Sequence, residues 1–212
     1  MLIEEFGACV VSVWRGLRPA TRSLVEGAVG AAQAPTTTAA AAGAKAARAG
    51  YDACSEWELS RLLAALDERA ADGVSAGLSG EQACALGQVA ETCARVLHRE
   101  ARSAEVFGQL LERALRARDY AHVDALADAL AGRLAPSETC ELVRHENWAV
   151  RAIAHEALLQ LPVGVLVGLL ADPVDAEVAR DALEHQADEF ESEEARWVVC
   201  ALEAADSAPD DL

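Results

Sequence analysis

Two groups of histidines and carboxylates come closest, in residue type and spacing, to a site that could carry chemistry. His145 follows Glu141 by four residues, and His155 lies ten residues further along. His185 and Glu189 stand at i and i+4, where they share one face of a helix. A metal centre requires three or four converging ligands, and a predicted helix boundary separates His145 from His155. The spacing therefore predicts solvated side chains and no metal site. For His185, the alternative is a site that binds a cation or a basic partner.

The sequence shows no recognisable catalytic or phosphate-binding motif. No serine, threonine or cysteine stands in an activating pattern, and Gly164 and Gly168 fall within a helical pattern instead of a phosphate-binding loop. The six cysteines form no C-x-x-C pair, and Cys84 and Cys93 lie on opposite faces of one predicted helix. We expect most of the cysteines to be small buried hydrophobic residues. The residues predict neither an enzyme nor a cofactor.

Trp148 is the residue best suited to binding another protein, because exposed tryptophan and arginine side chains are typical anchors of interfaces. Arg144 and Arg151 lie close to it in the sequence. His155 and Glu189 complete the predicted set of partner-binding residues. The alternative is that Trp148 packs against the preceding hairpin while Arg151 connects neighbouring repeats.

The charge of the chain restricts its partners. The 212 residues carry a formal charge of −17. Residues 1–50 hold five basic and three acidic side chains, and the remainder holds 13 basic and 32 acidic. This field repels phosphate backbones and disfavours nucleic acid. It favours a protein or peptide of basic or mixed charge, unless the charge only keeps the chain in solution.

The start of the chain and its amino-acid usage predict a cytoplasmic bacterial protein. Met1 to Glu5 is acidic where a signal peptide is basic, and no apolar run is long enough for a transmembrane segment. Lys45 is the only lysine, and usage rich in alanine and arginine suggests a GC-rich genome. Apolar residues make up 52% of the chain and aromatic residues 4%. Alanine has the highest helix propensity, so the composition predicts an all-α protein.

Residues 1–30 are predicted to form an N-terminal amphipathic region. One helical stripe carries the docking residues Phe6, Val10, Val13, Trp14 and Leu17, together with Cys9. Pro19 is expected to end this helix, and a second short one to begin after Thr21. Residues 31–50, rich in alanine and threonine, read as a linker. The tethered helix would dock on the body, pair with a second copy or lie on a membrane, and three arginines are few for membrane binding.

From residue 51 onward, regular helix signals succeed one another. Two capping boxes are predicted at Ser55-x-x-Glu58 and Ser79-x-x-Gln82. Further helices are expected to begin at Ser103, Asp119, Pro136, Asn147, Pro162 and Asp175, and the last at Ser192 or Glu193. Residues 206–212 are an acidic tail. The signals from Asp119 to Asp175 recur with a period of about 27 to 28 residues, which is typical of stacked helical hairpins.

The clearest unit is similar to the HEAT repeat, particularly the short variety named after phycobilisome lyases. The resemblance rests on Leu142, Asn147, Trp148, Val150, Arg151, Ala154, Ala157, Leu158 and Leu161. It implies a short α-solenoid of antiparallel hairpins over residues 51–205, with residues 55–98 as a capping pair. It also implies that Asn147, Arg151, Asp175 and Arg180 make structural contacts between repeats. The next unit departs from the pattern, since Ala179 follows Val178 and displaces Arg180 by one position.

The predicted function is a non-catalytic scaffold or adaptor that binds a protein or peptide on an acidic solenoid surface. Size and charge also suit an immunity or antitoxin protein that blocks a basic toxin, although no motif supports this. A bilin-lyase-like subunit is the alternative implied by the resemblance. Self-association through the stripe from Phe6 to Leu17 is a further possibility.

Overall fold

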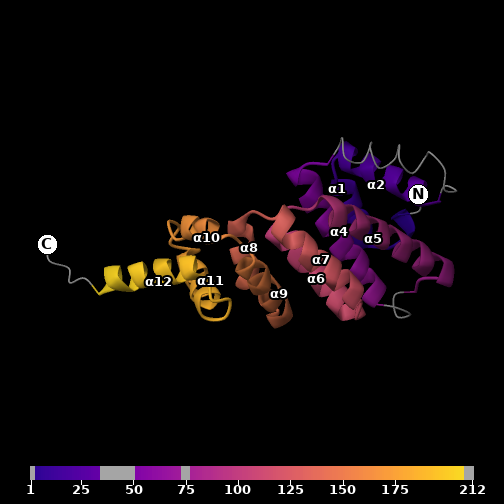
Figure 1. Ribbon diagram of the computed structural model, residues 1–212. Coiled ribbons are helices and arrows are strands. Elements are labelled where there is room, and N and C mark those ends of the chain that lie inside the picture. The colour runs from indigo at the N-terminus through magenta and orange to yellow at the C-terminus, as the bar shows by residue number, and fades with distance from the viewer. Residues whose placement is uncertain (1–2, 34–50, 73–76, 208–212) are drawn as a thin grey trace. The chain divides into compact units, whose positions relative to one another are not determined.

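The computed structural model describes residues 3–33, 51–72 and 77–207, and every regular element in these ranges is a helix (Figure 1). The predicted all-α class is therefore confirmed for the described chain. Most of the predicted linker and most of the acidic tail lie outside the described residues. The chain divides into two compact units, Met1–Ala101 and Arg102–Leu212. This division differs from the predicted one, which placed residues 51–205 in a single domain.

Unit 1 (Met1–Ala101) is a helical hairpin with two further helices packed on it. Its elements are the 3-10 helix η1 (Ile3–Glu5) and the helices α1 (Ala8–Gly16), α2 (Pro19–Gln33), α4 (Ala53–Ala71) and α5 (Gly80–Glu100). α1 packs on α4, α2 packs on both α4 and α5, and α4 packs along α5. The N-terminal region is thus part of a folded unit and not a detached helix.

The predicted N-terminal stripe is only partly buried in unit 1. Phe6, Val10 and Leu17 are buried, whereas Val13 and Trp14 are partly exposed. Ile3 and Val25 add to the same core. The stripe therefore docks on α4 of its own chain, which is one of the alternatives that the sequence left open.

In unit 1 the predicted start is correct for α5, whereas α4 and α2 begin at other residues than predicted. The capping box of Ser79 and Gln82 is confirmed at the start of α5. α4 begins earlier than predicted, because Asp52 is its N-cap and accepts a hydrogen bond from the Ser55 amide. Pro19 opens α2 instead of merely ending α1, which agrees with the preference of proline for the first helical position.

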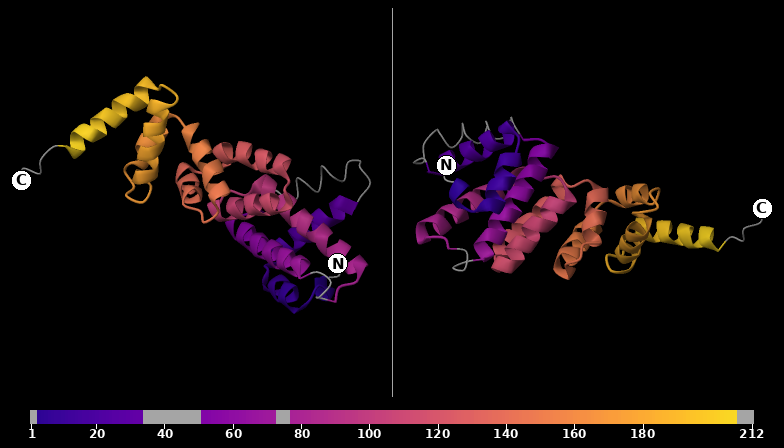
Figure 2. Two further views of the ribbon diagram at one scale, coloured as in Figure 1. Left: turned by 90° about the horizontal axis from the view of Figure 1, so that it is seen from below. Right: turned by 180° about the vertical axis from the view of Figure 1, so that it is seen from behind.

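Unit 2 (Arg102–Leu212) contains three successive hairpins and a last helix (Figures 1 and 2). Its helices are α6 (Ala104–Ala117), α7 (Tyr120–Arg133), α8 (Pro136–Val143), α9 (Trp148–Leu159), α10 (Val163–Leu169), α11 (Ala176–Asp188) and α12 (Glu193–Asp206). α6 contacts α8, and α8 contacts α10. Likewise α7 contacts α9, and α9 contacts α11. The odd- and even-numbered helices of the hairpins thus form two series, and α12 packs on α10 and α11.

Several predicted N-caps in unit 2 are confirmed. The side chains of Asp119, Asn147 and Ser192 each accept a backbone hydrogen bond at the start of α7, α9 and α12. Ser103 stands at the predicted position but makes no capping hydrogen bond. Glu138, which lies on α8, caps α6 instead: its carboxylate accepts a hydrogen bond from the Ala104 amide at 2.6 Å.

The core of unit 2 consists mostly of alanine, leucine and valine side chains, with Phe107 and Cys140 among them. In its C-terminal part, the five helices from α8 to α12 share one cluster of buried residues: Cys140, Leu158, Leu159, Val163, Leu166, Ala182, Leu183, Ala187 and Ala195. Many of these side chains are small, so the helices can approach one another closely. Within the described residues no single helix has the length and apolarity needed to cross a membrane; α9 and α10 reach these limits only together, across a bend of 119°.

Candidate partner-binding surface

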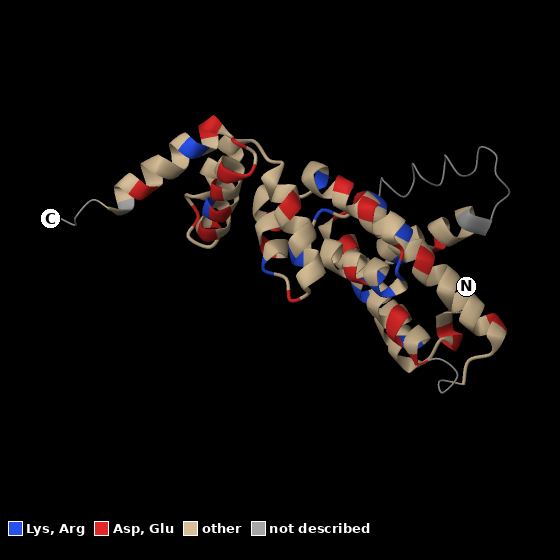
Figure 3. Ribbon diagram, turned by 60° about the horizontal axis from the view of Figure 1, so that its bottom comes forward, with Lys and Arg blue, Asp and Glu red and all other residues tan. Residues whose placement is uncertain are grey.

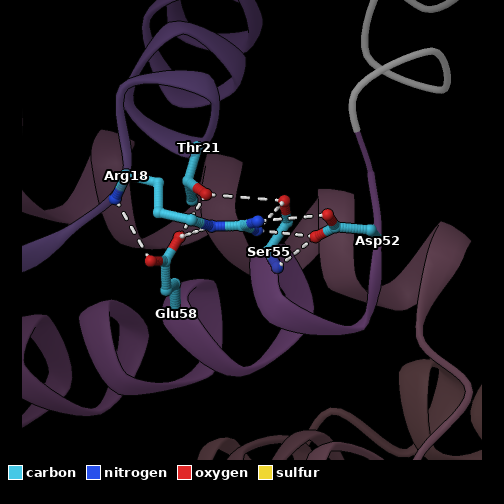
Figure 4. Close-up of polar contacts among 5 residues, drawn as sticks. All are labelled: Arg18, Thr21, Asp52, Ser55 and Glu58. Atoms are coloured by element: carbon cyan, nitrogen blue, oxygen red, sulfur yellow. Dashed lines mark hydrogen bonds and ion pairs between the residues drawn. The ribbon is translucent and has the colours of Figure 1, made fainter.

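A dense cluster of polar contacts joins the start of α2 to α4 in unit 1 (Figure 4). The guanidinium of Arg18 donates to both carboxylate oxygens of Asp52, at 2.6 and 3.2 Å. Its Nε lies 3.3 Å from Glu58 Oε2, while the backbone amide of Arg18 donates to Glu58 Oε1 at 3.1 Å. The buried hydroxyl of Thr21 also donates to Glu58, and Ser55 Oγ accepts from Arg18. We call these five residues the Arg18 clasp.

The clasp places one carboxylate at the N-terminus of each of two helices. Asp52 caps α4, where it accepts from the Ser55 amide at 2.7 Å. Glu58 accepts from the amide that immediately precedes α2. Carboxylates are stabilised at the positive ends of helix dipoles, and Arg18 lies between the two. The buried Glu58 is therefore satisfied on both oxygens, and the cluster holds α2 to α4 instead of facing a ligand.

The electrostatics of the clasp favour its charged state. The hydrogen bond from Arg18, followed by those from Ser55, holds the pKa of Asp52 well below its usual range. Burial alone would raise the pKa of Glu58, but the hydrogen bonds from Thr21 and Arg18 outweigh it and lower that pKa. The side-chain hydrogen bond with Asp52 raises the pKa of Arg18 above its ordinary value.

Acidification is expected to weaken the clasp. Both carboxyl groups have a lower pKa in the folded state than in the unfolded state, so the unfolded chain binds protons first as the pH falls. Their stabilising contribution is complete above about pH 5 and declines as the pH falls through about 4 toward the folded-state values. Urea unfolding of the parent should show this loss between about pH 7 and 3.5. The double variant Asp52→Asn, Glu58→Gln should lose less over that interval, and equal losses would contradict the assignment.

Two of the predicted partner-binding residues, His155 and Glu189, belong to one cluster between α9 and α11. His155 Nε2 lies 3.1 Å from Asp181 Oδ2, and His185 Nε2 lies 3.1 Å from Glu189 Oε2. The two imidazole rings meet edge to face with their centroids 5.4 Å apart. Within the described chain, no group of three or more histidine, cysteine or carboxylate side chains is arranged to hold a metal ion.

His145 lies apart from this cluster. Its Nδ1 accepts a hydrogen bond from the Asn147 amide at 3.1 Å. Its ring packs over α6, where a Cβ added to Gly108 would lie 2.9 Å from His145 Nε2. The side chain therefore fixes the turn between α8 and α9 and does not join His155 in a shared site.

The predicted partner-binding residue Arg144 connects neighbouring hairpins. Its Nη2 donates to the buried carboxylate of Asp175 at 2.8 Å, and its Nη1 donates to the Val174 carbonyl at 3.1 Å. Arg144 also lines an open groove of about 480 Å³ beside α11. Glu177, Asp181 and Glu184 face this groove, together with Arg180, Val143, Val174 and Val178. The groove therefore combines apolar side chains with carboxylates.

The residues predicted to connect repeats do so unequally. Asn147 caps α9, and its Nδ2 lies 3.5 Å from Glu112 of the preceding hairpin. Asp175 joins the α8–α9 hairpin to α11 through Arg144. Arg151, in contrast, donates to the carbonyls of His145 and Glu146 at 2.9 and 2.8 Å. Its hydrogen bonds thus lie in the turn of its own hairpin, contrary to the expectation from the HEAT pattern.

Large apolar side chains are exposed at the N-terminal ends of three successive helices of one series. Tyr120 is 64% exposed at the start of α7, and Trp148 is 74% exposed at the start of α9. Val174, two residues before α11, is 66% exposed. We call these three residues the N-terminal edge. Of the two alternatives that the sequence left open for Trp148, this exposure agrees with partner binding better than with packing against the preceding hairpin.

Two of the helices at this edge, α9 and α11, run in the same direction. Contacts between α9 and α11 join His155 to Asp181, and Gln186 to the carbonyls of Leu159 and Leu161. These partners are separated by 25 to 27 residues throughout, so the two helices are parallel and in register. Trp148 and Val174 therefore lie at the same end of the helix pair.

The charge of the chain is concentrated in unit 2. Residues 102–212 hold 9 basic and 23 acidic side chains, whereas residues 1–101 hold 9 basic and 12 acidic. Acidic positions are frequent along α11 (Figure 3), where Glu177, Asp181, Glu184 and Asp188 are all exposed. Unit 2 alone therefore produces most of the negative field.

Two residues that matter in unit 2, one exposed and one buried, were not recognised in the sequence. Tyr120 follows the Asp119 cap as Trp148 follows the Asn147 cap, and this 28-residue spacing could have found it. Gln186 donates from a buried position to two carbonyl groups at 2.9 Å each. A glutamine in an acidic, polar run of sequence gives no comparable signal.

The expectation that most cysteines are buried is wrong. No disulfide joins the six, all of which lie in the described ranges, and only Cys93 and Cys140 are buried; Cys9, Cys54, Cys84 and Cys200 are exposed. Burial, together with the charge of Asp175, raises the pKa of Cys140 to about 11. Cys140 is therefore a protonated core residue near the Arg144–Asp175 ion pair.

Comparison with known proteins finds no similarity from which a function could be transferred. No protein-family model matches the sequence, no curated protein is significantly similar to it, and no solved structure is significantly similar to it.

Proposed function

We propose that unit 2 is a short α-solenoid of HEAT-like hairpins that binds another protein, without catalysis, through the N-terminal edge and the adjoining acidic groove. The observation that carries this proposal is the exposure of Tyr120, Trp148 and Val174 at the ends of three successive helices. The partner is a protein or peptide of basic or mixed charge.

The repeat architecture is supported by the two series of helix contacts. α6, α8 and α10 follow one another, as do α7, α9 and α11. Neighbouring hairpins are joined by Asn147 with Glu112 and by Arg144 with Asp175. In stacked repeats each unit completes the core of its neighbour, and one series of helices commonly faces the partner.

The binding surface is supported by its composition. Interfaces are enriched in tyrosine, tryptophan and arginine, and a few such residues supply most of the binding free energy. Tyr120, Trp148 and Arg144 provide these types in unit 2. Arg144 is already oriented by Asp175, so little side-chain freedom remains to be lost when a partner binds.

Loss of the Trp148 ring is expected to weaken binding of the partner by about 10-fold or more. The intact chain would be immobilised, its partner captured from a lysate of the source cells and purified, and its dissociation constant measured for each variant. Trp148→Ala and Tyr120→Ala should both weaken binding. Trp57→Ala removes a ring of unit 1 that is 51% exposed and serves as the matched control. Equal binding by parent and Trp148→Ala would sink the proposal.

The electrostatic part of the proposal is tested by added salt. Opposite charges steer association, and salt screens them over a distance of about 8–10 Å. The association rate of the purified partner should fall as salt is added, while the dissociation rate changes less. An association rate independent of salt would contradict a basic partner and leave only the apolar contacts.

A further inference from the structure

The last helix of unit 2, α12, is apolar on two opposite faces. Its inner face contributes the buried Ala195 and the partly buried Val198 and Val199 to the core with α10 and α11. Trp197, Cys200, Ala201 and Ala204 are all exposed. These four stand at i, i+3, i+4 and i+7 and therefore form one stripe on the outer side of the helix. We call them the α12 stripe.

The α12 stripe is an unpartnered helix face in the described structure. Trp197 is 78% exposed, more than Trp148 or Tyr120. A surface helix normally opposes its apolar face with charged and polar residues, whereas a helix that is apolar all round is covered on all sides. The stripe spans about two turns, or roughly 10 Å of helix axis. This length matches the contact that a single crossing helix makes.

Charge determines what can cover this stripe. Glu193, Glu194 and Glu203 lie on α12 itself. Residues 172–207 contain 12 acidic and two basic side chains. A second copy of the chain would bring an equal negative charge within the screening length of about 8–10 Å. A covering element with lysine or arginine beside its apolar face would instead be attracted.

We infer that the α12 stripe is a second docking face of unit 2, and that its occupant is a basic amphipathic helix of another protein. The Trp197 ring would insert between side chains of the incoming helix. The small side chains of Cys200, Ala201 and Ala204 let its backbone approach to within the usual interaxial distance of about 8–10 Å. The flanking carboxylates would pair with its basic residues. This face is separate in the sequence from the N-terminal edge and does not depend on the proposed function.

The test uses two short amphipathic peptides of the same pattern, one built from leucine and lysine and the other from leucine and glutamate. Each would carry a fluorophore, and its dissociation constant with the intact chain would be measured by anisotropy. The lysine peptide should bind, and Trp197→Glu and Ala204→Glu should each weaken it by about 10-fold or more. Both substitutions add negative charge, so they would strengthen a merely electrostatic attraction. A loss of affinity must then come from the apolar contact.

Trp148→Glu is the matched control, because it adds the same charge at the N-terminal edge. It should leave the affinity for the lysine peptide within about 2-fold of the parent. If Trp148→Glu weakens binding and Trp197→Glu does not, the peptide occupies the edge, which overturns the α12 assignment without affecting the proposed function. Equal binding of the glutamate peptide would also overturn it. So would a dimer of the chain alone that Trp197→Glu dissociates, because the occupant would then be a second copy.

Discussion

Replacing Glu58 by alanine is expected to release α2 from α4 and to lower the free energy of unfolding of unit 1 by about 2–4 kcal/mol. The carboxylate is the acceptor for the buried Thr21 hydroxyl and for the Arg18 amide at the start of α2. Removing it leaves the Arg18 amide without its acceptor, leaves the Thr21 hydroxyl only the longer contact of 3.4 Å with Ser55 Oγ, and places the Arg18 charge beside a cavity. Glu58→Gln keeps an acceptor oxygen for Thr21 and should lose less.

Hydrogen exchange locates this effect in the chain. Amides of α1 and α2 should exchange faster in Glu58→Ala, and urea unfolding gives the overall change in free energy. Glu26→Ala is the control, since it removes an exposed carboxylate from α2 itself and should change stability by less than about 0.5 kcal/mol. Unchanged protection of α2 in Glu58→Ala would show that the Arg18 clasp does not hold the N-terminal helices in place.

The second large effect is expected in unit 2, where Gln186→Ala should lower the free energy of unfolding by about 2 kcal/mol. The side chain is buried, and its amide nitrogen donates to the Leu159 and Leu161 carbonyls at the C-terminal end of α9. The Leu159 carbonyl is among those that a helix cannot satisfy internally, and the Leu161 carbonyl lies in the turn that follows. Without Gln186 both carbonyl groups lose this donor, and of the side-chain hydrogen bonds described between α9 and α11 only that of His155 with Asp181 remains.

A nearby glutamine provides the control for this substitution. Gln160 lies at the C-cap of α9, but its side chain is exposed. Gln160→Ala should therefore change the unfolding midpoint little. Thermal unfolding of both variants separates the two cases, and similar losses would show that deletion of any glutamine side chain near this turn has the same consequence.

Local signals in the sequence located most helices but not always their first residue. Ser79 with Gln82 and the caps at Asp119 and Asn147 were predicted correctly, because each is satisfied by groups within four residues. Ser55 and Glu58 have the same spacing as a capping box, yet Asp52 caps α4. Glu58 is instead engaged by Arg18 and Thr21, which are 40 and 37 residues away. A tertiary contact of this kind leaves no local pattern.

The candidate surface was predictable in part for the same reason. Trp148 was singled out because it stands in the first turn of a helix, where a large ring can be exposed, and the repeat spacing leads to Tyr120. The partner of an arginine is harder to predict. The resemblance to the HEAT repeat predicts that Arg151 contacts a neighbouring repeat. Arg144 makes such a contact instead, because the turn places Arg151 beside the carbonyls of His145 and Glu146.

Hydrogen exchange with and without the purified partner tests most directly whether a partner binds at the N-terminal edge of unit 2. Binding should slow exchange in the first turns of α7, α9 and α11, around Tyr120, Trp148 and the segment after Val174. The same partner should give no such protection with Trp148→Ala at equal concentration. Protection confined to unit 1, or protection of unit 2 that bypasses these three turns, would contradict the account.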